Sequence, residues 1–115
     1  MTLEDFKNTL SGIGLKHYQD EEKEYIFVGY ATIFSDQKLP ICIYNKIEES
    51  AKVIHHKFSK FLQDEKEVWN VEDNPEELPT EFRNAKNFRE ALLNEFKIVR
   101  SVNADSLESR RTGKV

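Results

Sequence analysis

The sequence predicts an α+β domain: an N-terminal helix, then a small antiparallel sheet of two or three strands, then two longer amphipathic helices packed on that sheet. Three observations lead to this prediction. A capped apolar stripe begins the sequence, a long run of β-branched and aromatic residues follows, and apolar residues recur at helical spacing in two later segments.

The first residues predict a short helix. Thr2 can cap it, and Asp5 stands three residues further on, as in an acidic capping box. From Leu3 onward, apolar residues recur at i, i+3 and i+7, which gives the helix one buried face. Gly12 and Gly14 are expected to end the helix.

Three strands are expected next. Residues 25–34 and 39–44 should form an antiparallel hairpin, preceded by a short strand over 15–18 and a solvated acidic turn over 20–24. Both alternating faces of 25–34 are apolar, so this strand should be covered on both sides or by a partner. Pro40 cannot donate to a ladder, so it should lie near a strand start or at an edge.

Two longer helices are predicted after the sheet. Asn45 can cap the first, over about 46–63, with Glu48 three residues later. Its apolar stripe is Ile47, Ala51, Ile54, Phe58, Phe61 and Leu62. The second is expected to start at Thr80 and to end near Arg100. Its stripe is Phe82, Ala85, Phe88, Leu92, Phe96 and Val99.

Between these helices, Asn74-Pro75-Glu76-Glu77 predicts one helical turn that Pro79 limits. Beyond Arg100 the apolar periodicity fades. We therefore expect residues 1–100 to form a single small globular domain and residues 101–115 to form a polar, mobile C-terminal tail.

Composition narrows the functional classes. The chain has 115 residues, 17 Lys and Arg against 21 Asp and Glu, and a net charge of −4. It has no apolar run long enough to cross a membrane and no signal peptide pattern. The single cysteine excludes an intramolecular disulfide and fits a reducing compartment. A cytoplasmic protein that does not contact membranes is expected.

Residues that could carry catalysis are scattered. His55 and His56 are adjacent and would point about 100° apart on a helix, so they would not bind one metal ion together. Cys42 has no local base to form a thiolate. We therefore expect no catalytic residue, no metal and no cofactor. An enzyme with a diffuse site around His17, His55 or Cys42 is the alternative.

An acidic segment stands out from the rest of the chain. Residues 64–81 carry eight acids and one lysine, a net charge of −7, which leaves +3 for the remaining residues. The segment also contains the only tryptophan. We expect a non-enzymatic interaction or regulatory protein that engages a basic protein partner, of which a nucleic-acid enzyme is one kind. The candidate contact residues are Glu65, Glu67, Trp69, Glu72, Asp73, Glu76 and Glu77.

Three other interpretations stay open. The acidic segment could be only a solvated connection, with Trp69 packed back on the core. A nucleic-acid-associated regulatory module would use the strand aromatics Tyr25, Phe27, Tyr30 and Tyr44 and the basic tail residues Arg100, Arg110, Arg111 and Lys114. A homodimer would complete the strand that is apolar on both faces.

Overall fold

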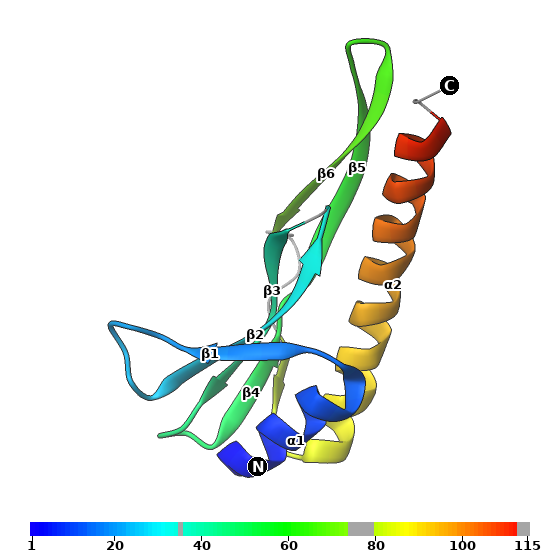
Figure 1. Ribbon diagram of the computed structural model, residues 1–115. Helices are drawn as coiled ribbons and strands as arrows, with labels where there is room; N and C mark the ends of the chain where they lie inside the picture. The colour runs from blue at the N-terminus through cyan, green and yellow to red at the C-terminus, as the bar shows by residue number, and fades with distance from the viewer. Residues whose placement is uncertain (35, 74–79, 113–115) are drawn as a thin grey trace.

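The computed structural model describes residues 1–34, 36–73 and 80–112, with side chains except at residues 73 and 106–112. In chain order the elements are α1 (Leu3–Ile13), β1 (Lys16–Gln19), β2 (Ile26–Ile33), β3 (Gln37–Asn45), β4 (Ser50–Val53), β5 (His56–Gln63), β6 (Lys66–Asp73), β7 (Thr80–Phe82) and α2 (Ala85–Thr112). The antiparallel main sheet has the order β1-β2-β3-β4-β7, and β5 pairs with β6 in a separate two-stranded sheet (Figure 1). Neither α1 nor α2 is both long and apolar enough to cross a membrane within the described residues.

The N-terminal helix is confirmed. Thr2 accepts a hydrogen bond from the backbone N–H of Asp5, whose carboxylate accepts one from the N–H of Thr2, so the capping box is complete. The helix ends at Gly14, which adopts φ 93°, a left-handed conformation that glycine takes without strain. The strands expected near 15–18, 25–34 and 39–44 are also present, as β1, β2 and β3.

The predicted small sheet and pair of long helices are wrong, because the described residues contain two helices, α1 and α2, and a main sheet of five strands. The expected helix over 46–63 is instead β4 and β5. Asn45 does accept hydrogen bonds from the N–H groups of Ile47 and Glu48, as a helix cap would. Here the same bonds close a tight turn, with Glu49 at φ 53°, that returns the chain beside β3.

Residues 50–53 also fit the alternation of buried and exposed residues that is typical of a strand, besides the helical spacing described above. Ala51 and Val53 are buried while Lys52 between them is exposed, which is the alternation of a strand with one covered face. Pairing with β3 on one side and β7 on the other gives these backbone groups their hydrogen bonds. The pairing of β4 with β3 and β7 therefore decides its structure, and the helical spacing of the apolar residues in 46–63 does not.

The start of the last helix also differs from the prediction. Thr80 does not cap it but begins β7, which pairs with β4. The cap is Asn84, whose side-chain oxygen accepts hydrogen bonds from the N–H groups of Lys86 and Asn87. The helical turn expected at 74–79 lies outside the described residues.

The helix α2 does not end near Arg100 but continues to Thr112. Beyond Arg100, Val102 is buried, and Asn103 accepts a hydrogen bond from the N–H of Phe34 at 3.0 Å. Helix and sheet therefore stay in contact past the expected boundary. The mobility of residues 101–115 stays a prediction.

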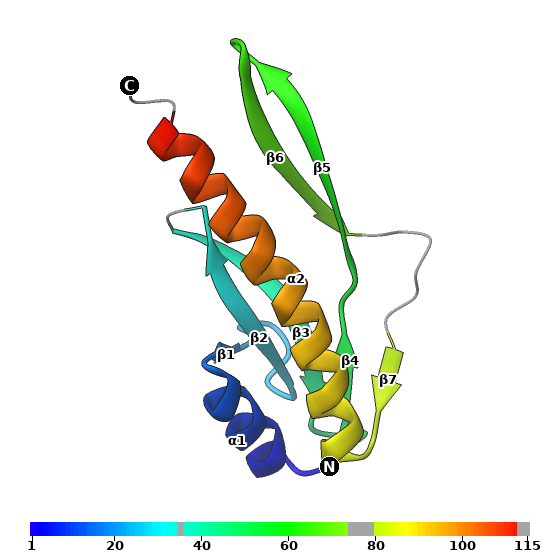
Figure 2. The same ribbon diagram turned by 90° about the vertical axis from the view of Figure 1, so that its right-hand side faces the viewer.

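Both helices pack on the same face of the main sheet (Figure 2). Between them Phe6 stacks on Tyr44, with ring centroids 5.2 Å apart, and on Phe88, at 5.8 Å. Gly29 allows α1 to approach β2 closely, since a Cβ there would lie 2.5 Å from the sulfur of Cys42 and 3.1 Å from Leu10. These contacts form a single core between the helices and the sheet.

Only one of the two apolar faces of β2 packs against the helices. Phe27, Ala31 and Ile33 point into the core. On the other face lie Ile26 and Tyr30, half-buried, and no helix of the described chain covers that face (Figure 2). Cover by a partner stays a prediction.

Candidate functional site

Residues 64–73 of the predicted acidic segment belong to a protruding hairpin. Strands β5 and β6, residues 56–73, form this hairpin, which we call the arm. It continues from β4 beyond the main sheet and runs beside the C-terminal half of α2 (Figures 1 and 2). The segment is therefore ordered as strand and turn over residues 64–73, rather than as an extended acidic loop.

The turn of the arm places two acids at its far end. Gln63 pairs with Lys66, so Asp64 and Glu65 are the two turn residues. Their φ angles are 52° and 64°, the left-handed values that a two-residue hairpin turn requires at both positions. Aspartate tolerates this conformation, whereas Glu65 adopts it at some cost.

Apolar side chains lie exposed beside these acids. Phe61 has 46% of its surface exposed and Leu62 has 74%. Glu67, opposite Leu62 in the β5–β6 register, is exposed as well. Because successive residues of a strand alternate between its faces, Phe61 and Leu62 lie on opposite faces of the arm, and the turn acids lie beyond both.

A polar cluster ties the middle of the arm to α2. The indole N–H of Trp69 donates to a carboxylate oxygen of Asp105 at 2.8 Å, and the ammonium of Lys60 lies 2.9 Å from the same oxygen. That ammonium also lies 4.7 Å from the centre of the Trp69 ring and 3.7 Å from a carboxylate oxygen of Glu67. The pKa of Asp105 lies below its ordinary value. The largest cause is the hydrogen bond from the Lys60 ammonium, and the next is the hydrogen bond from the Trp69 indole.

A second cluster holds the base of the arm. Glu95 of α2 is buried and accepts a hydrogen bond from the backbone N–H of His56 at 3.2 Å. Its two oxygens lie 3.6 Å and 3.3 Å from Nδ1 of His55 and Nδ1 of His56. Burial raises the pKa of Glu95, but the hydrogen bonds and charges of the two histidines outweigh it, so the pKa lies below the ordinary 4.5. The arm therefore contacts α2 at two positions, its base at Glu95 and its middle at Asp105.

Removing Asp105 is expected to loosen the arm without unfolding the domain. In Asp105→Ala the indole of Trp69 loses its acceptor and Lys60 loses its closer carboxylate. Trp69, the only tryptophan, should then emit at longer wavelength, and amide exchange should accelerate in β5 and β6. The unfolding temperature should change little, since these groups are solvent-exposed. Unchanged exchange in the arm would show that α2 does not brace it.

The structure separates the predicted contact residues. Glu65 lies in the turn of the arm. Glu67 and Trp69 lie on the same face of the arm as their register partners Leu62 and Lys60. Glu72 lies on the other face, with its partner Lys57. Trp69 is half-buried and its indole bonds to α2. Asp73 ends β6, while its side chain and residues Glu76 and Glu77 lie outside the described part.

The residues of the alternative interpretations are also spread out. Phe27 and Tyr44 are buried in the core, so they are not on one surface with Tyr30. Burial raises the pKa of the Cys42 thiol to about 12, which disfavours a thiolate. His17 lies on β1, in the main sheet, whereas His55 lies at the base of the arm. In the described residues, no group of three or more His, Cys, Asp and Glu side chains is arranged to hold a metal ion.

Sequence reasoning did not find the residues that position the arm. Asp105 falls in the expected tail, Lys60 falls on the polar face of one expected helix, and Glu95 falls in the other expected helix without an assigned role. A buried glutamate could have been suspected from the spacing of Glu95 three residues after Leu92 and four before Val99, which are both core residues. Comparisons of this chain with family models, curated proteins and solved structures find no match.

Proposed function

We propose that this protein is a small non-enzymatic binding protein that inserts the tip of its arm into a basic surface of a protein partner. The observation that carries the proposal is the combination at the tip of exposed Phe61 and Leu62 with the turn acids Asp64 and Glu65. Apolar surface supplies binding energy, and carboxylates select and steer a basic partner.

The two attachments to α2 support this role. An arm held at Glu95 and at Asp105 loses less conformational freedom on binding than a free hairpin would. An isolated two-stranded hairpin is marginally stable, so the contacts with α2 give the tip a defined position. In this proposal Trp69 positions the arm, and the partner contacts are Phe61, Leu62 and the tip acids.

The charge of the arm supports a basic partner, although it is partly balanced. Strand β5 brings Lys57 opposite Glu72 and Lys60 near Glu67. At the turn itself, Asp64, Glu65 and Glu67 oppose only Lys66. The negative potential is therefore concentrated at the tip. A cytoplasmic location, inferred from the single cysteine, belongs to the same proposal.

Charge reversal on the arm tests the proposal. In a triple variant Asp64→Lys, Glu65→Lys and Glu67→Lys, we expect recovery of the partner from native cell extract to fall by about tenfold or more, because steering and rim contacts at the tip become repulsive. The matched control reverses three exposed acids in the turn between β1 and β2, as Glu21→Lys, Glu22→Lys and Glu24→Lys. The control should recover the partner like wild type. Equal recovery by both variants would refute the role of the arm.

A further inference from the structure

Two adjoining hollows lie on the side of the molecule where α1 and α2 meet the edge of the main sheet. The first, of about 300 Å³, lies between β2 and α2, and the second, of about 360 Å³, lies between α1 and β1. Leu15, Lys16 and Tyr30 line both, so the two hollows adjoin at these residues, and we call the pair the groove. The groove uses none of the arm residues.

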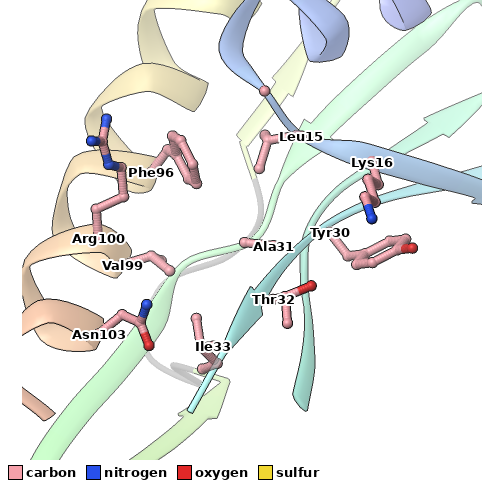
Figure 3. Close-up of a pocket in the computed structure, with 11 residues that line it drawn as sticks. Leu15, Lys16, Tyr30, Ala31, Thr32, Ile33, Phe96, Val99, Arg100 and Asn103 are labelled. Carbon is pink, nitrogen blue, oxygen red and sulfur yellow. The ribbon is translucent and has the colours of Figure 1, made fainter. Parts of the chain in front are cut away.

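The first hollow has an apolar floor. Figure 3 shows Phe96 and Val99 reaching from α2 toward Ala31 and Ile33 of β2, with Leu15 above them. All but Phe96 are buried, and Phe96 is half-buried. A hollow of this size and lining suits the apolar part of a small molecule.

The rim of the groove is cationic. Arg100 borders the first hollow, and Lys7, Ser11 and His17 line the second. Lys16 lies at the boundary of both, but its register partner is Tyr30, so its side chain belongs to the sheet face away from the helices. Among the described residues, no aspartate or glutamate lines either hollow, although the whole chain has more acids than bases. Among the side chains that the structure describes, the carboxylates in ion pairs bind other cations, not Lys7, Lys16 or Arg100.

Two of these cations are supported on aromatic rings. The ammonium of Lys7 lies 5.8 Å from the ring centre of Phe27, and the guanidinium carbon of Arg100 lies 5.7 Å from that of Phe96. Such contacts favour a charged group held close to apolar surface. The groove therefore places positive charge directly beside an apolar floor, an arrangement complementary to an amphipathic anion.

We propose that this groove binds a small organic carboxylate with an apolar body. The apolar body lies in the first hollow, against Ala31, Phe96 and Val99. The carboxylate lies in the second hollow, beside Lys7 and His17. A nucleotide is less well suited, because its polar base and sugar would displace water from the apolar floor without pairing.

Binding of decanoate, below its micelle-forming concentration, to the whole chain tests the proposal by titration calorimetry and by NMR shifts. We expect saturable binding of one decanoate per chain, with shifted methyl signals of Leu15, Ala31 and Val99. Decanol, which lacks the charge, and adenosine monophosphate, which lacks the apolar tail, should each bind about tenfold more weakly or not at all.

The variant Lys7→Gln should weaken decanoate binding by about tenfold, because it removes charge at the carboxylate end of the groove. Lys46→Gln, a change of an exposed lysine in the turn between β3 and β4, is the matched control and should bind like wild type. The proposal is overturned if decanoate does not bind, if adenosine monophosphate binds more tightly than decanoate, or if Lys7→Gln binds decanoate like wild type.

Discussion

Phe88→Ala is expected to lower the free energy of unfolding by about 3–5 kcal/mol, the range for removing a buried phenylalanine. Phe88 is fully buried at the start of α2, and its ring stacks on Phe6 at 5.8 Å and lies 6.3 Å from Phe82. It therefore joins α2 to α1 and to β7 at one point. Domains of this size are stable by about 5–15 kcal/mol, so the loss is a large part of the total.

Urea unfolding followed by circular dichroism measures this loss. The matched control is Phe61→Ala, which removes an equally large ring from the exposed part of the arm. That control should lose far less stability than Phe88→Ala, since 46% of the Phe61 surface stays exposed in the folded protein. Equal destabilisation by the two changes would contradict the position of the core.

Glu95→Ala is expected to lower the free energy of unfolding by about 3 kcal/mol. The reason is that the change removes a buried, charged acceptor from the histidines at the base of the arm. The backbone N–H of His56 loses this acceptor, and the rings of His55 and His56 each lose one carboxylate contact. Glu90→Ala is the matched control on the exposed face of the same helix and should change stability little.

The contribution of Glu95 should also depend on pH. Its pKa is below the ordinary 4.5 in the folded protein, so its stabilisation is fully present above pH 4.5 and is lost as the pH falls through the folded pKa. Glu95→Gln, which does not ionise there, lacks this component. The stability difference between wild type and Glu95→Gln should therefore shrink below pH 4.5. A difference that grows in acid would contradict the assigned hydrogen bonds.

Local signals predicted the elements that depend on local contacts. The capping box of Thr2 and Asp5 and the left-handed Gly14 define α1 through residues within a few positions of one another. Strand β2 has strand-forming residues along nearly its whole length, and the apolar stripe from Phe88 to Val99 lies on one face of α2. These elements follow from short-range chemistry.

The elements that were missed depend on distant residues. The same Asn45 bonds can start a helix or close a tight turn, and pairing with β3 decides between them. The turn of the arm uses Asp64 and Glu65 where asparagine and glycine are the usual signal, so it was not recognised as a hairpin turn. The acidic character of the candidate site was predictable from composition, but its attachment through Asp105 and Glu95 was not, because α2 lies far along the chain.

Amide hydrogen exchange of the protein, free and bound to its recovered partner, is the most direct test that the arm is the recognition element. The proposed docking predicts slower exchange on binding in residues 61–68, at the tip of the arm, with exchange in β1–β3 unchanged. Protection confined to β1–β3, with none at the tip of the arm, would contradict it.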